Sequence, residues 1–158
     1  MLSAVAVAGV LGYRHFESIP GQSATNIALP RLDGPGTGRL ADWHGTPVVV
    51  NLFASWCPSC LNEMPALERA SHDYAGQVII VGVDSQDSPA SGLRLARQLG
   101  ITYPLLADNG RADLYSLLKG QGMPLTAFLG RDGTVKRVYS GALDEALLRQ
   151  LIDQLLLS

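Results

Sequence analysis

The sequence predicts an α/β fold in which a partly parallel sheet is covered by helices. Two continuous apolar runs, 47–54 and 78–83, are short and uncharged, as is typical of strands buried on both faces. Apolar residues recur at helical spacing between the two runs and again near the C-terminus. The chain has 158 residues, of which 47% are hydrophobic, so it is long enough for one domain with a sizeable core.

We expect residues 25–158 to form this domain and residues 1–24 to form an apolar segment and a linker. The stretch 1–12 carries no charge and is rich in Ala, Val and Leu. Twelve helical residues span about 18 Å, against about 30 Å for a hydrocarbon core. No basic residues precede the stretch, and its Ala-x-Ala comes too early for ordinary cleavage. We interpret it as the remainder of a membrane anchor that starts upstream; a signal segment, a buried element and a stray apolar tail are the alternatives.

Charge and cysteine content argue against nucleic-acid binding and against a disulfide-stabilised scaffold. The net charge is −2, from 12 basic and 14 acidic residues, which gives no electrostatic footprint for nucleic acid. The 2 cysteines lie in one short motif, so the fold does not depend on a disulfide scaffold.

Both cysteines, Cys57 and Cys60, fall where the strand 47–54 ends and a helix begins. Pro58 suits the first helical position, where a missing N–H costs nothing. A helix N-terminus carries partial positive charge and free N–H groups, which favour a thiolate and should lower the pKa of Cys57. Three residues of helix bring the two sulfurs onto one face, within reach of a disulfide.

Three uses of this cysteine pair compete. A structural disulfide closing so small a ring would constrain the unfolded chain little. A zinc site needs four ligands, and the chain adds only the scattered histidines His15, His44 and His72. Thiol–disulfide exchange is favoured, because C-x-x-C after a strand and opening a helix is typical of that chemistry.

The remaining elements follow from local signals. Ser88 and Pro89 start a helix that Gly100 ends. The loop 84–87 lacks the glycine and distal glutamate of a calcium loop. Further elements are an extended segment at 101–106, a short helix at 111–119, a hairpin of 126–129 with 135–139, and a closing helix at 144–157.

The stretch VVNLFASWCPSCLNEMP, residues 49–65, resembles the thioredoxin-like proteins of the TlpA/ResA/CcmG type. These are bacterial, extracytoplasmic thiol–disulfide oxidoreductases, and the resemblance runs from about Ile27 to the C-terminus. It implies a thioredoxin-like fold: a mixed central sheet with helices on both faces and a central β-α-β insertion over 78–106. It further implies a strand near 27–30.

The resemblance also implies roles for residues near the cysteines. Thioredoxin has a buried aspartate where this chain has Asn51, and the TlpA/ResA-like proteins place a glutamate at the position of Glu63. That carboxyl is expected to act as acid and base for Cys60; a solvated or capping residue is the alternative. Pro124 is expected to be cis beside the pair, so that the Met123 backbone pairs with an extended substrate; an ordinary trans turn proline is the alternative.

Three further side chains are expected at the substrate face. Trp56 covers Cys57, with simple packing as the alternative, and Pro58 and Ser59 lie between the thiols and influence the reduction potential. No metal site and no cofactor beyond the redox-active cysteine pair is expected.

The resemblance implies a membrane-associated reductase of protein disulfides, in the periplasm or on the extracytoplasmic face of a bacterial membrane. Cys57 would attack and Cys60 would resolve the mixed disulfide. The implied partners are clients with their own C-x-x-C, such as apocytochrome c or copper-site assembly proteins, and a membrane thiol carrier as electron donor. The competing readings are a dithiol oxidant, a peroxiredoxin-like antioxidant and a copper-binding assembly factor.

Overall fold

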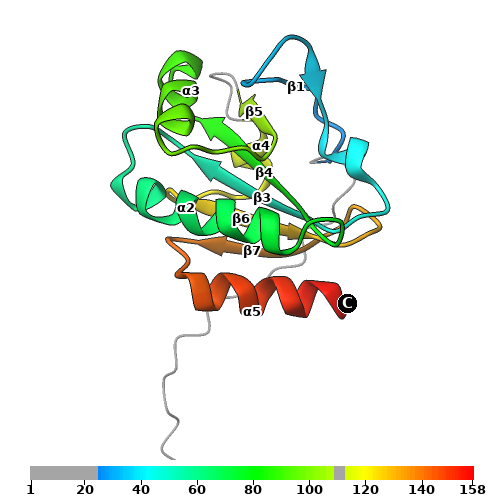
Figure 1. Cartoon of the computed structure of the whole chain (residues 1–158). Coiled ribbons are helices and arrows are strands. Elements are labelled where there is room, and N and C mark those ends of the chain that lie inside the picture. Colours follow the sequence, from blue (N-terminus) through cyan, green and yellow to red (C-terminus); the bar gives the residue numbers. More distant parts are fainter. Residues whose placement is uncertain (1–24, 109–112) are drawn as a thin grey trace, which may run out of the picture.

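The computed structural model describes residues 25–108 and 113–158, and its centre is a five-stranded mixed sheet (Figure 1). The strand order is β5-β4-β3-β6-β7. Strands β3, β4 and β5 are parallel, whereas β6 and β7 run antiparallel to their neighbours. The bounds are β3 Val48–Phe53, β4 Ile79–Ser85, β5 Leu105–Asp108, β6 Leu125–Leu129 and β7 Val135–Ser140.

Helices cover both faces of the sheet, as the sequence predicts for strands that are apolar on both sides. One apolar cluster joins the sheet to α2 (Pro58–Asp73), α3 (Pro89–Gln98) and α5 (Glu145–Leu156). A second cluster, on the opposite face, includes α4 (Asp113–Leu117) and the segment that precedes β3. Every residue of β3 is buried, and successive side chains alternate between the two clusters.

The segment before β3 holds a short antiparallel pair, β1 (Leu29–Pro30) with β2 (Thr37–Gly38), and the 3-10 turn η1 (Leu40–Trp43). It lies along the outer edge of β5 through an isolated bridge between Arg31 and Leu106 and a hydrogen bond from Leu32 N to Leu105 O of 2.9 Å. The family resemblance implies a strand near 27–30, and β1 occupies the second half of that range.

Other boundaries differ in detail from the sequence expectations. Asp84 and Ser85 belong to β4 rather than to a loop, and both are buried. Ser88 occupies the N-cap of α3, but its side chain makes no capping hydrogen bond there. The expected start of the short helix at 111 and the whole N-terminal segment 1–24 lie outside the described residues. In the described ranges, the structure has no helix with the length and apolarity needed to cross a bilayer.

Candidate active site

The cysteine pair lies at the first turn of α2, directly after β3. The chain leaves β3 through a turn in which Cys57 N donates to Ala54 O at 3.1 Å. Pro58 then occupies the first position of α2. Cys57 and Cys60 form a disulfide with a Cα–Cα distance of 5.3 Å. The Cys60 N–H points at the Cys57 sulfur, at 3.2 Å, so an N-terminal amide of α2 is directed at the atom that would carry charge as a thiolate.

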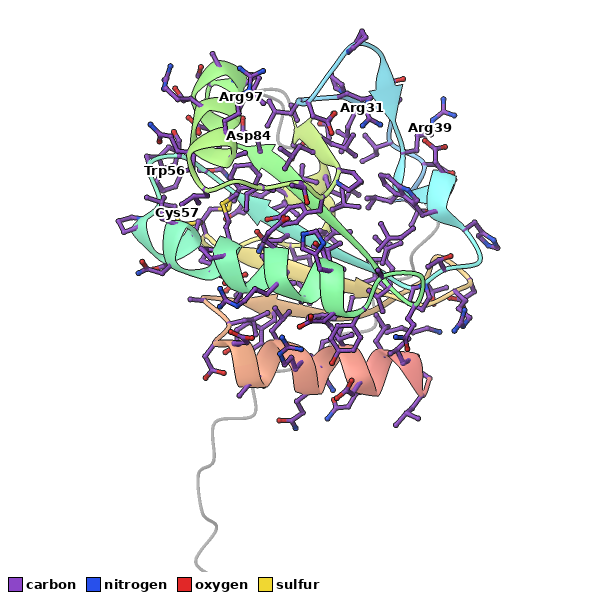
Figure 2. The ribbon with its side chains drawn as sticks, in the orientation of Figure 1. Arg31, Arg39, Trp56, Cys57, Asp84 and Arg97 are labelled. Carbon is purple, nitrogen blue, oxygen red and sulfur yellow. A yellow bond between two sulfur atoms is a disulfide. The ribbon has the colours of Figure 1, made fainter. Side chains whose placement is uncertain are left out.

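The disulfide is almost covered, but its surroundings are open to solvent. Cys57 is 4% exposed and Cys60 1%, so the two differ little in the oxidised state. Trp56, by contrast, is 58% exposed, and Pro58 and Ser59 are exposed beside it. Figure 2 shows Trp56 and Cys57 together at the end of the sheet where α2 begins. A polypeptide docking here would meet the indole and Pro58 before it reached sulfur.

The segment before Cys57 is hydrogen bonded to the loop after β4. The Trp56 indole Nε1 donates to Gln86 O at 3.0 Å, and Ser55 N donates to Asp87 Oδ2 at 2.6 Å. A loop from the neighbouring strand therefore fixes the orientation of the Trp56 side chain.

Glu63 lies one turn beyond Cys60 on α2 and is 2% exposed, so the expectation of a solvated residue, held as the alternative to acid–base action, is wrong. Its carboxyl Oε1 accepts from Asn51 Nδ2 at 2.7 Å and from Thr126 Oγ1 at 3.4 Å. Its Oε2 accepts from the Leu143 amide at 2.9 Å. The carboxyl thus joins α2 to β3, β6 and the segment before α5.

Burial dominates the protonation of this carboxyl. It raises the pKa of Glu63 to about 7, even though the hydrogen bonds from Leu143, Thr126 and Asn51 act in the opposite direction. Beside it, Asn51 Oδ1 is buried without a hydrogen-bond partner. A carboxyl with this pKa can hold or release a proton near neutral pH, which is what acid–base assistance to a buried thiol requires.

The second predicted stretch lies where β6 begins. The Met123–Pro124 peptide bond is cis, as the resemblance implies. Met123 packs against the apolar cluster that contains both cysteines, and Pro124 is buried, with its carbonyl accepting from Gly141 N at 2.9 Å.

Sequence reasoning misses the contributions of three residues to this region, Asp84, Asp87 and Leu143. It places Asp84 and Asp87 in an unremarkable loop, although Asp84 is 2% exposed and its hydrogen-bonded neighbour Asp87 contacts Ser55. The sequence does contain an indication of the burial of Asp84. This residue directly follows the apolar run 78–83, and an acid in that position can still lie within the strand. Leu143 is also missed, since its contribution is a backbone N–H that carries no sequence signature.

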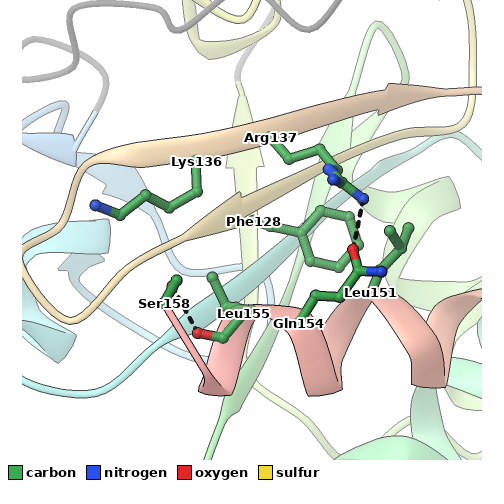
Figure 3. A pocket seen from close by; sticks show the side chains of 7 residues that line it. All are labelled: Phe128, Lys136, Arg137, Leu151, Gln154, Leu155 and Ser158. Carbon is green, nitrogen blue, oxygen red and sulfur yellow. Dashed lines mark hydrogen bonds between the residues drawn. The ribbon is translucent and has the colours of Figure 1, made fainter. Parts of the chain in front are cut away.

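The structure also has a pocket of about 140 Å³ between α5 and the strands β6 and β7 (Figure 3). Within it, Arg137 donates to Gln154 Oε1 at 3.0 Å. The pocket contains none of the predicted site residues; it is lined by Phe128, Lys136, Arg137, Leu151, Gln154, Leu155 and Ser158.

Comparison with known proteins agrees with this geometry. The AhpC/TSA family model matches residues 20–138. The thiol-disulfide oxidoreductase ResA of Halalkalibacterium halodurans is 26% identical over 164 residues, covering 96% of this chain and 91% of ResA. The thiol:disulfide interchange protein DsbE of Pseudomonas fluorescens is 31% identical over 121 residues, covering 77% of this chain and 66% of DsbE.

The fold has counterparts among solved structures. Mycobacterium tuberculosis DsbF, in its mixed oxidised and reduced forms, superposes with a TM-score of 0.76 at 22% identity, covering 84% of this chain and 96% of DsbF. This likeness identifies the thioredoxin-like fold. With the cysteine pair opening α2 and the matches to ResA and DsbE, the chain belongs to the AhpC/TSA family and is a thiol–disulfide oxidoreductase of the ResA and DsbE kind.

Proposed function

We propose that this enzyme reduces disulfides of client proteins, with Cys57 as nucleophile and Cys60 as resolving thiol. The observation that carries the proposal is the buried Glu63, one turn beyond Cys60 and with a pKa of about 7. A proton acceptor in this position suits a reaction in which a second, shielded thiol must be deprotonated.

The reaction runs in two exchanges. The Cys57 thiolate attacks one sulfur of the client disulfide, the client S–S bond breaks, and the departing client thiolate takes up a proton. Cys60 then transfers its proton towards Glu63 and attacks the Cys57 sulfur, which releases the second client thiolate. Two electrons pass to the client, and Cys57 and Cys60 end as the disulfide.

Client docking would use the exposed surface around the disulfide. Trp56, Pro58 and Ser59 are exposed there, and the Met123 backbone precedes β6 beside the same apolar cluster. An extended client segment could pair with the Met123 main chain while its own disulfide lies against Cys57.

The proposal extends to setting and partners through the family resemblance. The enzyme would act on the extracytoplasmic face of a bacterial membrane, held there by residues 1–24. Its clients would be proteins with a C-x-x-C, such as apocytochrome c or copper-site assembly proteins. A membrane thiol carrier would return Cys57 and Cys60 to the dithiol.

Two measurements test the proposal. The reduction potential should lie nearer to about −270 mV, the value of thioredoxin, than to about −120 mV, that of a strong dithiol oxidant. A Cys60→Ser variant in the native host should accumulate mixed disulfides with C-x-x-C clients. A potential near that of the oxidant would support disulfide formation instead. Peroxide turnover would support a peroxiredoxin-like antioxidant, and tight Cu(I) binding by the dithiol would support a copper-binding assembly factor.

A further inference from the structure

A second buried acid, Asp84, lies close to the start of α2. It occupies the penultimate position of β4, opposite Phe53 of β3 and Ala107 of β5, and it is 2% exposed. Helix α3 has a glycine, Gly92, where it crosses this carboxyl, and a Cβ there would overlap the carboxyl group. The space for a buried acid is therefore made by two elements, the strand and the helix that covers it.

Asp84 is hydrogen bonded to a second carboxyl, that of Asp87 in the loop that follows β4. Two carboxyl groups can share a hydrogen bond only when one of them carries a proton. Burial, together with the charge of Asp87, raises the pKa of Asp84 to about 7. Burial opposes a lower pKa for Asp87, but hydrogen bonds from Ser55, Ser88 and Asp84 nevertheless lower it. The proton therefore lies on Asp84, and Asp87 is the ionised partner.

The ionised partner holds the chain that leads into the cysteine pair. Asp87 Oδ2 accepts from Ser55 N at 2.6 Å, and Oδ1 accepts from Ser88 N at 2.7 Å. Between the two acids, Gln86 has a φ of 56°, a left-handed conformation that is uncommon outside glycine, and its carbonyl accepts the Trp56 indole N–H. The loop therefore contacts two successive residues immediately before Cys57. Figure 2 shows Asp84 at the same end of the sheet as Trp56 and Cys57.

We propose that the Asp84–Asp87 pair is a positioning element for the nucleophile: it shares one proton, and Asp87 holds the Ser55–Trp56 segment that presents Cys57. This inference rests on the proposed role of Cys57 as the attacking thiol. When the shared proton is lost, two adjacent negative charges repel each other, and the contact between the loop and the Ser55–Trp56 segment loosens.

The groups around Asp84 leave Asp87 as its partner. On β5, Asp108 is occupied by Ser85 Oγ and by the amides of Leu114 and Tyr115. On α3, Arg94 donates to Ser91 Oγ and Arg97 is exposed. On β3, the facing residue Phe53 carries no charge. Asp84 Oδ1 is buried and has no hydrogen-bond partner in the described part of the chain.

The first test follows Trp56 in the oxidised protein, in which neither cysteine titrates. The protein is labelled with 5-fluorotryptophan, and Trp56→Phe assigns the two ¹⁹F resonances. We expect the Trp56 resonance to move with a midpoint near pH 7, the value to which the pKa of Asp84 is raised. The step should vanish in Asp84→Asn, whose amide can donate to Asp87 at every pH.

Two matched variants test whether the step in the Trp56 resonance arises from another buried acid. Glu63→Gln removes the other carboxyl with a pKa of about 7, and Asp108→Asn alters the equally buried acid at the end of the next strand. The step should persist in both variants. Its absence from the wild type, its survival in Asp84→Asn, or its loss in Glu63→Gln would overturn the proposal. Because the test uses the disulfide form, it is independent of the reductase direction and of which cysteine attacks.

The second test measures positioning through rescue. Asp87→Ala removes the acceptor for Ser55 N and should slow attack by the reduced protein on a peptide disulfide by about tenfold. Asp87→Asn retains an acceptor oxygen and should recover most of that rate. Asp132→Ala is the control and should leave the rate unchanged. Asp132 likewise accepts from a backbone amide, Thr134 N, but in a turn far along the chain from Cys57. Equal rates in Asp87→Ala and the wild type, or an equal loss in Asp87→Asn, would contradict a positioning role.

A separate measurement distinguishes failure of the reductase proposal from failure of the positioning role of Asp84 and Asp87. In the same samples, alkylation mapped to individual cysteines shows whether Cys57 is the first thiol to react. If Cys60 reacts first, the assumed nucleophile is wrong whatever the Trp56 titration shows. If Cys57 reacts first but the Asp84 and Asp87 variants behave as wild type, the acid pair has no positioning role.

Discussion

The side chain of Asn51 donates from Nδ2 to Glu63 Oε1 at 2.7 Å, which joins the central strand β3 to the helix that carries both cysteines. The same amide nitrogen lies 3.0 Å from Thr126 Oγ1 on β6. An amide in this position keeps a hydrogen bond to the carboxyl without adding a second titrating group. The site therefore has one acid on the Cys60 side, and its protonation can be studied by changing one residue.

The first prediction concerns Glu63 in catalysis. Glu63→Gln keeps the shape of the side chain but cannot take up a proton, so we expect release of the mixed disulfide by Cys60 to slow by about 100-fold near neutral pH. Attack by Cys57 on a small disulfide should change far less. Stopped-flow kinetics with a fluorescent peptide disulfide, followed across pH, separates the two steps.

Glu68→Gln is the matched control for this prediction. Glu68 lies on the same helix, but its carboxyl binds Thr102 and His72 near the surface instead of lying beside the cysteine pair. Its substitution should leave both steps unchanged. Equal slowing in the two variants, or an unaltered pH dependence in Glu63→Gln, would count against acid–base assistance by Glu63.

The second prediction concerns the pH dependence of stability. Folding raises the pKa of Glu63 from 4.5 to about 7, so between these values the folded state binds more protons than the unfolded state. The contribution of Glu63 to stability is thus fully present below about pH 4.5 and is lost as pH rises through 7. At roughly 1.4 kcal/mol per pKa unit, Glu63→Gln should be about 1–3 kcal/mol more stable than the wild type at about pH 8.

Urea unfolding of both proteins at acidic and alkaline pH measures this difference. The gain should shrink towards zero in acid, where Glu63 is protonated in both states. Glu68→Gln should show the opposite trend, because hydrogen bonds from Thr102 and His72 outweigh burial and lower the pKa of Glu68. A stability difference for Glu63→Gln that is independent of pH would show that the carboxyl does not titrate in this range.

The third prediction places an acid where thioredoxin has one. In Asn51→Asp, two carboxyls would lie within hydrogen-bond distance in a buried site, and like charges so close cannot both ionise readily. We expect the free energy of unfolding to fall by about 2–4 kcal/mol at about pH 8 and by much less in acid. Asn62→Asp, at an exposed position of the same helix, is the control and should change stability little. Equal effects of the two substitutions would argue against the Asn51–Glu63 contact.

The fourth prediction assigns the attacking thiol. In the reduced protein Cys57 is expected to react first, because it caps α2 with its sulfur facing the Cys60 amide, whereas Cys60 lies within the helix. Iodoacetamide labelling at neutral pH followed by peptide mapping measures the two rates. The single variants Cys57→Ala and Cys60→Ala give each thiol's rate alone, and faster labelling of Cys60 would reverse the assignment.

Much of this arrangement follows from the sequence. Uncharged apolar runs in the sequence predict the buried strands, and a proline directly after Cys57 indicates where α2 begins. These signals are local, so they survive without knowledge of the fold. The disulfide between Cys57 and Cys60 follows in the same way, since two cysteines three residues apart at the start of a helix lie within bonding reach.

What the sequence could not supply is the environment that the fold creates. The residue type of Glu63 does not indicate whether its carboxyl is solvated or buried. The Leu143 amide that donates to this carboxyl lies 80 residues away in the sequence. Asp84 looks like the start of a polar loop until β5 and Gly92 of α3 enclose it. The protonation of both acids depends on such distant contacts, so it becomes visible only in three dimensions.

The strand pairing described at the outer edge of β5 has a consequence for how the enzyme avoids unwanted association. An open sheet edge offers free N–H and C=O groups to any extended chain. On this side, the bridge between Arg31 and Leu106 and the bond from Leu105 N to Asp33 Oδ2 occupy several of them. The opposite edge, β7, carries Lys136 and Arg137, and charged side chains on an edge discourage strand addition. Addition of a further strand is thereby discouraged at both edges of the five-stranded sheet.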